Sequence, residues 1–380
     1  MKVEFYKHNL EEDDIQRMVD VCRGVFLTTG QLTKAFEEAF AGYLGAKQAI
    51  GLTSCTAAIH LALLAVGVGP DDEVITTPMT FAATSNCILY TGATPVFVDV
   101  DGKTGLIDPD AVSRAITPKT KAIIPVHLYG LMADMRRLKA IADAAGLKLI
   151  EDCAHAIESE RDGVRPGQLS DAACFSFYAT KNITSGEGGA VATNDDQVAQ
   201  QVRLLRQHGM SASAADRYTG TYRHWDLEAL GWKYNMTNLQ AAMLMGQLSR
   251  IGELWKQRER VARRYEAAFI GAEGVSFPLV IDGARSARHL FTIWVAPERR
   301  DQVLSDLQER GIGVAVNYRA VHLLKYYQDR FGFTRGMFPE AERIGDSTVT
   351  LPLYPKLTDA QIDYVADSVK AVAAALTPRT

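Results

Sequence analysis

Apolar residues recur with two alternating spacings along this chain, and these spacings predict its helices and strands. Between Leu32 and Leu44 the apolar residues follow the first by 3, 4, 7, 8, 11 and 12 positions, which places them on one helical face that ends before Gly45. Short and almost continuously apolar runs come next. We expect them to form strands at residues 48–52, 73–77, 95–100, 121–126, 147–151, 173–178 and 189–193.

Segments with helical spacing separate most of these predicted strands. The clearest of them cover residues 55–66, 81–90 and 134–145. Strands that alternate with helices of this length are typical of βαβ units and a mainly parallel sheet. The low polarity of the strands indicates that helices cover both faces of that sheet.

The alternation ends near residue 194, where a different organisation begins. Residues 195–208 have helical spacing, 209–232 are polar and loop-like, and Thr237 is a suitable N-cap for a long helical stretch. Beyond about residue 255 we expect fewer elements. They are strands near 289–296 and at 313–316, a helix near 300–310, and a final helix from about residue 359.

Length and composition favour two domains. Because 380 residues exceed the size at which a single hydrophobic core stops growing, we predict a large α/β domain over residues 1–250 and a smaller α+β domain over 251–380. Hydrophobic residues make up 47% and charged residues 23%, which excludes an intrinsically disordered or collagen-like chain. The 41 basic and 45 acidic residues leave a net charge of −4 and no basic footprint for a nucleic acid.

The cysteines and the N-terminal segment bear on the cellular compartment. The five cysteines include no pair with CxxC spacing, and their odd number is typical of free thiols in a reducing compartment. The segment MKVEFYKHNLEEDD lacks the apolar run of a signal peptide, and the longest weakly polar run, 57–69, is too short to cross a bilayer. We therefore expect a cytoplasmic protein that does not enter a membrane.

Familiar phosphate-binding and metal-binding motifs are missing, but one segment is a candidate anion site. The chain contains no GxxxxGK[ST] loop, no HExxH pair and no cysteine and histidine set with metal-ligand spacing, and residues 67–70 lack the third glycine of a dinucleotide fingerprint. Residues 53–57 (TSCTA) follow a predicted strand and open a predicted helix. Their N–H groups either bind an anion or are simply capped by a hydroxyl side chain, and both interpretations stay open.

An acid and a lysine follow two of the later strands. Asp152 comes directly after the strand 147–151, at the edge where open parallel sheets bind ligands, and it can pair with a cationic ring nitrogen or simply face water. Lys181 lies between the strand 173–178 and the glycine-rich turn 186–189. In an interior turn such a lysine loses its proton more easily and forms a Schiff base, whereas on the surface of a hairpin it is solvated.

Taken together, these groups meet the requirements of pyridoxal phosphate. That cofactor needs a phosphate cradle, an aromatic ring to stack on, an acid that keeps its ring nitrogen protonated, and a lysine for covalent attachment. Residues 53–57, Phe81, Asp152 and Lys181 supply these groups in this order. Once displaced by substrate, the lysine can move protons as a general acid and base.

The chain also resembles a known family over most of its length. The stretches that carry the resemblance include LTTGQLTKAFEEAFAGYLGA (27–46), TSCTAAIHLAL (53–63), IEDCAHAIES (150–159), FSFYATKNITSGEGG (175–189) and GWKYNMTNLQAAM (231–243). They are similar to the DegT/DnrJ/StrS-type sugar aminotransferases, which have the fold of the fold-type I pyridoxal-phosphate enzymes. The resemblance implies a large domain with a mainly parallel seven-stranded sheet and a smaller α+β C-terminal domain.

The resemblance also implies a role for each matching residue. Lys181 would bind pyridoxal 5'-phosphate as a Schiff base and act in catalysis with Asp152, which would pair with the ring nitrogen. The other cofactor-binding residues would be Ser54, Cys55, Thr56, Ala57 and Ser176 at the phosphate, Phe81 and His155 at the ring, and Asn235 from the neighbouring subunit of a homodimer. The sugar-nucleotide site would contain Tyr6, Phe26, Leu27, Thr28, Thr29, Tyr318, Arg319 and His322.

Three segments bear on the branch of the family. KNITSGEGG and GWKYNMTN are similar to branches that aminate a 4-keto group on a UDP-linked sugar, which include the 4-amino-4-deoxy-arabinose, pseudaminic-acid and bacillosamine pathway enzymes. VNYRAVHLLKYYQDRFGF is more similar to the first of these. Cys55 stands where alanine is common, and Tyr178 stands where that branch often has histidine. The implied reaction moves an amino group from L-glutamate to a keto-sugar nucleotide, and its product would serve lipopolysaccharide or surface glycan synthesis.

Two other functions are compatible with the same fold. A pyridoxal-phosphate sugar dehydratase of this fold has histidine in place of the lysine, and a non-catalytic regulatory member would have lost the lysine, the acid or the phosphate residues. A nicotinamide dehydrogenase would require the glycine fingerprint that the chain lacks. Lys181 together with Asp152 therefore favours the aminotransferase over all three.

Overall fold

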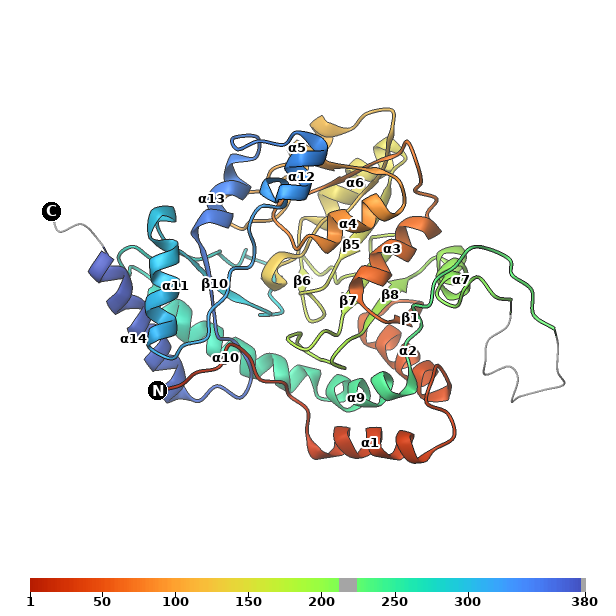
Figure 1. Ribbon diagram of the computed structural model, residues 1–380, viewed down its shortest axis with the longest axis horizontal. Coiled ribbons are helices and arrows are strands. Elements are labelled where there is room, and N and C mark those ends of the chain that lie inside the picture. Colours follow the sequence, from red (N-terminus) through yellow and green to blue (C-terminus); the bar gives the residue numbers. More distant parts are fainter. Residues whose placement is uncertain (212–223, 377–380) are drawn as a thin grey trace.

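A seven-stranded sheet forms the centre of the molecule, as Figure 1 shows. In spatial order its strands are β1 (Gln48–Leu52), β8 (Gly189–Thr193), β7 (Ala172–Ser176), β5 (Lys148–Asp152), β4 (Thr120–Ile123), β2 (Glu73–Thr76) and β3 (Thr94–Phe97). β8 is antiparallel to both of its neighbours, β1 and β7. All other neighbouring strands of this sheet are parallel to each other. The computed structural model describes residues 1–211 and 224–376. The predicted mainly parallel seven-stranded sheet is confirmed.

Helices cover both faces of this sheet. One face packs against α3 (Cys55–Ala65), α4 (Ala83–Tyr90) and α7 (Asp196–Leu205). The other packs against α2 (Gln31–Leu44), α5 (Pro109–Ala115), α6 (Met135–Ala145) and α9 (Asn238–Ser249). Because successive strand residues point to opposite faces, Ile50 and Leu52 belong to the first cluster and Ala49 to the second. Burial on both sides explains why the polar residues of these strands lie mostly at the strand ends.

The C-terminal region has a core of its own. It contains α10 (Ile251–Phe269), α11 (Arg300–Glu309) and α14 (Asp359–Leu376), which pack around the antiparallel pair β10 (Phe291–Trp294) and β11 (Thr348–Leu351). Val3 joins this core through a bridge to Ile312, so the first residues of the chain pack against the C-terminal region. This arrangement is the α+β part that was predicted. The boundary at residue 250 falls at Arg250, between α9 and α10, and it stays a prediction.

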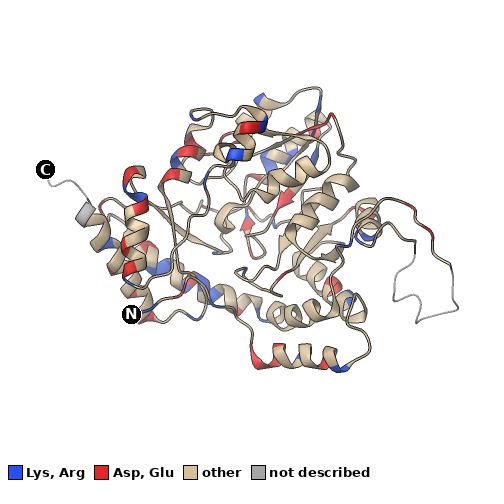
Figure 2. Ribbon diagram, viewed as in Figure 1, with Lys and Arg blue, Asp and Glu red and all other residues tan. Residues whose placement is uncertain are grey.

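The remaining elements lie outside the sheet, its covering helices and the C-terminal core. They are α1 (Glu12–Arg23), α12 (Lys325–Phe331), α13 (Pro339–Ser347), the pair β6 (Glu160–Arg161) and β9 (Ala284–Arg285), and the 3-10 turns η1 (Leu128–Gly130), η2 (Pro297–Arg299) and η3 (Val321–Leu323). Charged residues gather on outer helices such as α1, α11 and α14, whereas α3 carries none (Figure 2). Within the described residues, no helix has the length and low polarity needed to cross a membrane.

The structure corrects two expectations about the second half of the chain. The segment 313–316 is not a strand. Gly313 bonds to Val3 whereas Ala315 bonds to Thr350, so the segment changes partner after two residues and forms no continuous strand pairing. The long helical stretch after the N-cap Thr237 is two helices, α9 and α10, separated at Arg250. Of the predicted loop 209–232, residues 212–223 lie outside the described residues.

Candidate active site

A cavity of about 540 Å³ opens where the parallel strands end. The sheet side contributes Ser54, Cys55, Thr56, Asp152, Ser176 and Lys181. The C-terminal region contributes His289, Leu290, Asn317 and Tyr318. The cavity therefore lies between the two cores, at the edge where open parallel sheets bind their ligands.

The start of α3 presents backbone N–H groups to this cavity. Ser54 is the N-cap, and its Oγ accepts a hydrogen bond of 3.0 Å from the N–H of Ala57. The preceding N–H groups, those of Cys55 and Thr56, have no partner inside the helix and are available to an anion. Gly189 of β8 packs so closely that a Cβ there would lie 2.3 Å from the carbonyl carbon of Ser54. The segment is thus both capped and open to an anionic ligand.

Asp152 is a buried carboxylate held by donors on two sides. Thr84 Oγ1 donates to its Oδ2 at 2.7 Å, and the N–H of Ala154 donates to Oδ1 at 3.1 Å. Because a carboxylate only accepts, the Thr84 hydrogen points to Asp152, and Thr80 Oγ1 at 2.8 Å donates to Thr84 in turn. Burial, and then the charge of Asp152, raise the pKa of the Cys55 thiol, which stays protonated. Asp152 is therefore oriented to pair with a cationic group in the cavity.

Lys181 belongs to the hairpin between β7 and β8, yet its amine faces the cavity. The turn is closed by the N–H of Lys181, which donates to the carbonyl of Tyr178 at 2.9 Å. Burial lowers the pKa of the amine from 10.5 to about 8, although the charge of Asp152 opposes this shift. The hairpin that the surface interpretation predicted is present, but the lysine on it is an interior one. Near neutral pH such an amine can give up its proton and act as a nucleophile.

His155 forms one wall of the cavity together with Tyr318. Its Nδ1 accepts a hydrogen bond of 3.2 Å from the N–H of Tyr129, so its Nε2 carries the hydrogen and donates to Tyr318 Oη at 3.1 Å. Burial, and then the positive charge of Lys181, lower the pKa of His155 well below 6.5. Phe81 precedes α4, and its ring centroid lies 5.8 Å from that of Tyr318. Two neutral rings and an exposed phenyl group thus offer flat surfaces to a planar ligand.

Most of the residues predicted for the cofactor meet in this one cavity. They are Ser54, Cys55, Thr56, Phe81, Asp152, His155, Ser176 and Lys181. Ala57 lies behind them, buried, with its N–H engaged by the cap of α3. Asn235 does not line the cavity, and its Nδ2 donates to Thr29 Oγ1 at 2.6 Å.

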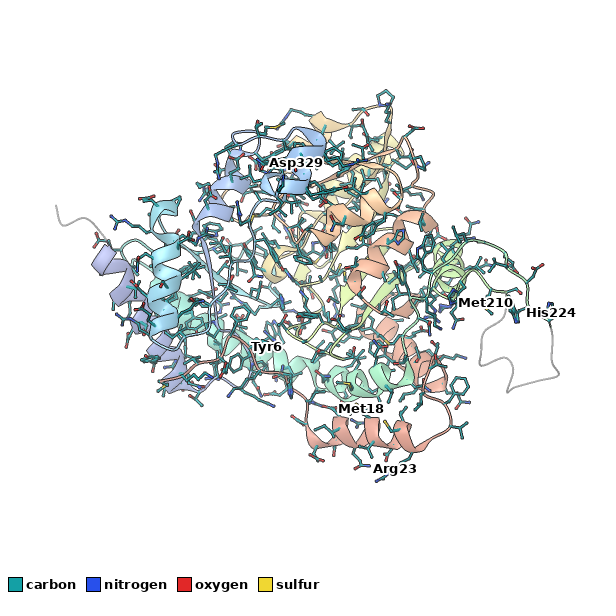
Figure 3. All side chains as sticks on the ribbon, viewed as in Figure 1. Tyr6, Met18, Arg23, Met210, His224 and Asp329 are labelled. Atoms are coloured by element: carbon teal, nitrogen blue, oxygen red, sulfur yellow. The ribbon has the colours of Figure 1, made fainter. Side chains whose placement is uncertain are left out.

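The predicted sugar-nucleotide residues do not come together in one place. Tyr318 lines the cavity, but the loop Phe26–Thr29 does not and packs instead on the start of α9, where Thr28 O accepts from the N–H of Asn238. Arg319 is exposed outside the lining, and His322 is buried with its Nε2 3.0 Å from Glu342 Oε1. The remaining residue, Tyr6, which Figure 3 labels, is 41% exposed next to Phe5, which does line the cavity. The roles of these residues stay predictions.

Several residues of the cavity were missed from the sequence. His289 and Asn317 come from the C-terminal region, and nothing in their local pattern distinguishes them from packed polar residues. Thr80 and Thr84 lie on opposite sides of Phe81 in the sequence and are one helical turn apart from each other. That spacing was the one signal in the sequence that could have identified them.

Among the residues that the structure describes, one buried cluster outside the cavity has metal-ligand chemistry, namely His127, Glu151 and Cys153. The Nδ1 of His127 accepts from the N–H of Ala133 at 3.2 Å, so its Nε2 carries a hydrogen and donates to Glu151 Oε2 at 2.7 Å. A protonated ring nitrogen offers no lone pair to a metal ion. His127 and Glu151 are therefore held by hydrogen bonds rather than open to a metal ion.

Comparisons with known proteins agree with this geometry. Residues 8–370 match the DegT/DnrJ/EryC1/StrS aminotransferase family. The spore coat polysaccharide biosynthesis protein SpsC of Bacillus subtilis is 41% identical over 368 residues, which cover 95% of this chain and 94% of SpsC.

Solved structures extend the similarity to the fold. Spr1654 from Streptococcus pneumoniae, whose name describes a sugar aminotransferase, was solved in a PMP-form that superposes with a TM-score of 0.93 at 31% identity, covering 98% of this chain and 100% of that chain. Its PLP-form superposes with a TM-score of 0.92, covering 99% of both chains. DesV of S. venezuelae, solved with a ketimine intermediate, has a TM-score of 0.91 at 34% identity over 98% of both chains.

Proposed function

Because the chain belongs to the DegT/DnrJ/EryC1/StrS aminotransferase family, we propose that it transfers the amino group of L-glutamate to a keto sugar carried by a nucleotide. Membership makes it a pyridoxal-phosphate-dependent sugar aminotransferase. The observation that carries the proposal is the convergence of Lys181, Asp152 and the start of α3 on one cavity of about 540 Å³.

The residues present fit pyridoxal phosphate. Two free N–H groups at the start of α3 suit its phosphate, and the space that Gly189 leaves empty lies directly beside them. Asp152 would pair with the ring nitrogen, His155 and Phe81 would flank the ring, and Lys181 would hold the cofactor covalently. When bound, the cofactor supplies an electron-withdrawing ring that stabilises negative charge on the carbon bearing the amino group.

The side chains around this site divide the remaining tasks among them. Lys181, with its pKa lowered to about 8, can accept a proton from a substrate carbon and return it, because its two protonation states are close in free energy at cellular pH. Asp152 keeps a positive charge on a partner nitrogen, and Thr84 keeps Asp152 in place. The protonated Cys55 thiol adds no second charge beside Asp152.

The proposed acceptor is a UDP-linked 4-keto sugar, of the type aminated by 4-amino-4-deoxy-arabinose enzymes. The sequences of residues 181–189 and 231–238, which resemble those of such enzymes, support this choice. The aminated product would enter lipopolysaccharide or another surface glycan, which agrees with the polysaccharide pathway in which SpsC is named. The nucleotide-linked substrates of such a pathway favour a cytoplasmic site of action.

We further propose a homodimer whose two subunits share their active sites. Phe26–Thr29 and Asn235 contact one another but not the cavity of their own chain. If these residues serve a sugar-nucleotide and phosphate site, that site must belong to another copy. Tyr6, Arg319 and His322 are assigned to the sugar side on the family resemblance alone.

The decisive experiment is the visible absorption spectrum of the purified protein before and after L-glutamate is added. A yellow band that glutamate removes, followed by its return when UDP-4-keto sugars are supplied, supports donor and acceptor together. Lys181→Ala should abolish the borohydride-stable attachment of the cofactor, and Lys139→Ala, at a half-buried lysine paired with Asp143 outside the cavity, is the matched control.

Each contrary outcome points to a different error. A yellow protein that ignores glutamate but reacts with another amino acid contradicts the proposed donor. A protein that loses a hydroxyl group from the sugar without incorporating nitrogen is a dehydratase. Analytical ultracentrifugation that finds only monomers at assay concentrations contradicts the shared site.

A further inference from the structure

His289 is a buried histidine that the proposed function leaves without a task. It precedes β10 in the C-terminal region, and only 3% of it is exposed. Its Nε2 lies 3.4 Å from Lys181 Nζ, and its ring centroid lies 4.4 Å from that of His155. The C-terminal region therefore places an imidazole directly against the reactive amine of the sheet region.

Asn182 determines which nitrogen of His289 carries the hydrogen. Its Nδ2 donates at 2.8 Å both to the carbonyl of Ala287 and to Glu158 Oε2. Because the Ala287 carbonyl can only accept, the amide nitrogen must face it, and Asn182 Oδ1 then faces His289 Nδ1 at 3.1 Å. Nδ1 is consequently the donor. The neutral ring is left with an acceptor lone pair on Nε2, the atom that faces Lys181.

The surroundings keep this imidazole neutral. Burial lowers the pKa of His289 well below 6.5, and the positive charges of Lys181 and Arg258 and the adjacent His155 act in the same direction. The titratable groups that face Lys181 from other elements are Cys55 on α3, Asp152 on β5, His155 after β5 and His289 before β10. Of these, His289 is the group within hydrogen-bonding distance of the Lys181 amine.

We propose that His289 is a positioning residue whose neutral Nε2 accepts a hydrogen bond from Lys181 Nζ and so fixes the direction of the lysine amine in the cavity. With one N–H held by His289, rotation about the last bond of the lysine side chain is restricted, and the nitrogen lone pair turns to the cavity. The catalytic consequence rests on the proposed function, whereas the contact itself does not.

Two variants separate this role from a purely structural one. His289→Gln places an acceptor oxygen near the position of Nε2 but loses the donor that Asn182 requires. His289→Asn keeps a donor near the position of Nδ1 but cannot reach Lys181. A positioning role predicts that the glutamine variant resembles the wild type and the asparagine variant does not, and a structural role through Asn182 predicts the reverse.

The readout is the titration of Lys181 in the full chain without cofactor. The rate of reductive methylation by formaldehyde and cyanoborohydride is measured at Lys181 against pH, by mass spectrometry of its peptide. A hydrogen bond to an acceptor stabilises the ammonium form, so its loss lowers the pKa of Lys181 further. We expect a wild-type midpoint of about 8. We expect His289→Asn to lower it by about one pH unit and His289→Gln to leave it in place.

Controls make the outcome decisive. His60→Asn removes another buried histidine, whose ring nitrogens have no hydrogen-bond partner within the described residues, and it should not change the midpoint. If His289→Asn fails to fold, His289→Met removes the acceptor at nearly constant volume and carries the same expectation. An unchanged midpoint in the acceptor-free variant overturns the proposal. A midpoint lowered equally in His289→Gln and His289→Asn overturns it as well.

The cofactor-loaded enzyme provides a second, separable measurement. His289→Asn should lower kcat about tenfold and leave the KM for the sugar nucleotide unchanged, because a misdirected amine affects proton transfer and not binding. If the wild type transfers no amino group to any keto sugar, the proposed function fails while the titration of Lys181 still tests the contact.

Discussion

Glu151 and Asp152 are neighbours at the end of β5, and they point to opposite faces of the sheet. Glu151 is enclosed, with one oxygen bonded to His127 and the other to the N–H of Gly167 and the hydroxyl of Ser170. Asp152 is also buried and accepts hydrogen bonds from Thr84, from the N–H of Ala154 and, more weakly, from the Cys55 thiol, but unlike Glu151 it lines the cavity.

The difference lies in what each carboxylate has left to bind. Every oxygen of Glu151 has protein partners, so it fixes the position of the segments that follow β4 and β5. Asp152 is oriented by Thr84 and keeps accepting capacity toward the cavity. Two acids of the same strand end therefore serve stability in one case and chemistry in the other.

Of the variants that test this comparison, we expect Asp152→Asn to have the largest effect, and we expect that effect on turnover. An amide cannot keep a partner ring nitrogen positively charged, so kcat should fall by about 10³-fold while cofactor binding and the melting temperature change little. Steady-state kinetics and a thermal melt of the loaded enzyme measure both. A variant with wild-type turnover would contradict the pairing of Asp152 with the cofactor.

Glu151→Gln should have the opposite profile. Its amide group would face the N–H of His127 and leave a buried donor unpaired, so the free energy of unfolding should fall by about 2 kcal/mol. Urea unfolding measures this change, and the kcat of the folded fraction should stay close to that of the wild type. A loss of kcat without a loss of stability would refute the division of roles between the two acids.

Thr84→Val tests whether the hydrogen bond from Thr84 orients Asp152 for catalysis. It removes the hydroxyl that orients Asp152 at nearly constant volume, and we expect kcat to fall about tenfold. Thr80→Val, which removes the donor one step further away, should lower kcat less. Equal losses in the two variants would indicate that packing rather than orientation of Asp152 is responsible.

The smallest effect concerns the pH dependence of stability in the chain without cofactor. Since burial lowers the pKa of Lys181 from 10.5 to about 8, the unfolded state binds more protons than the folded state between these two pH values. The free energy of unfolding should therefore rise from pH 8 to 10.5 more steeply in the wild type than in Lys181→Met. Urea unfolding at several pH values measures this difference, and parallel curves would contradict the buried amine.

Local pattern was enough for the elements that build the sheet. β1 and β8 begin and end at the predicted residues, because continuously apolar runs bounded by polar or glycine residues have few other solutions. The C-terminal region was predicted less well. β11 and α13 were missed and 313–316 was assigned wrongly. The pairing of β11 with β10 and of Ala315 with Thr350 joins residues far apart in the chain, which a local pattern does not reveal.

The sequence by itself determined the chemistry of the sheet side of the cavity. The βαβ pattern predicts a mainly parallel sheet whose ligands bind at the carboxyl ends of the strands, and Asp152, Ser176, Lys181 and the start of α3 all follow or end predicted strands and line one cavity. Tertiary structure alone decided what faces them. His289 reaches Lys181 because the C-terminal core packs over the strand ends, and no periodicity encodes a contact between residues 108 positions apart.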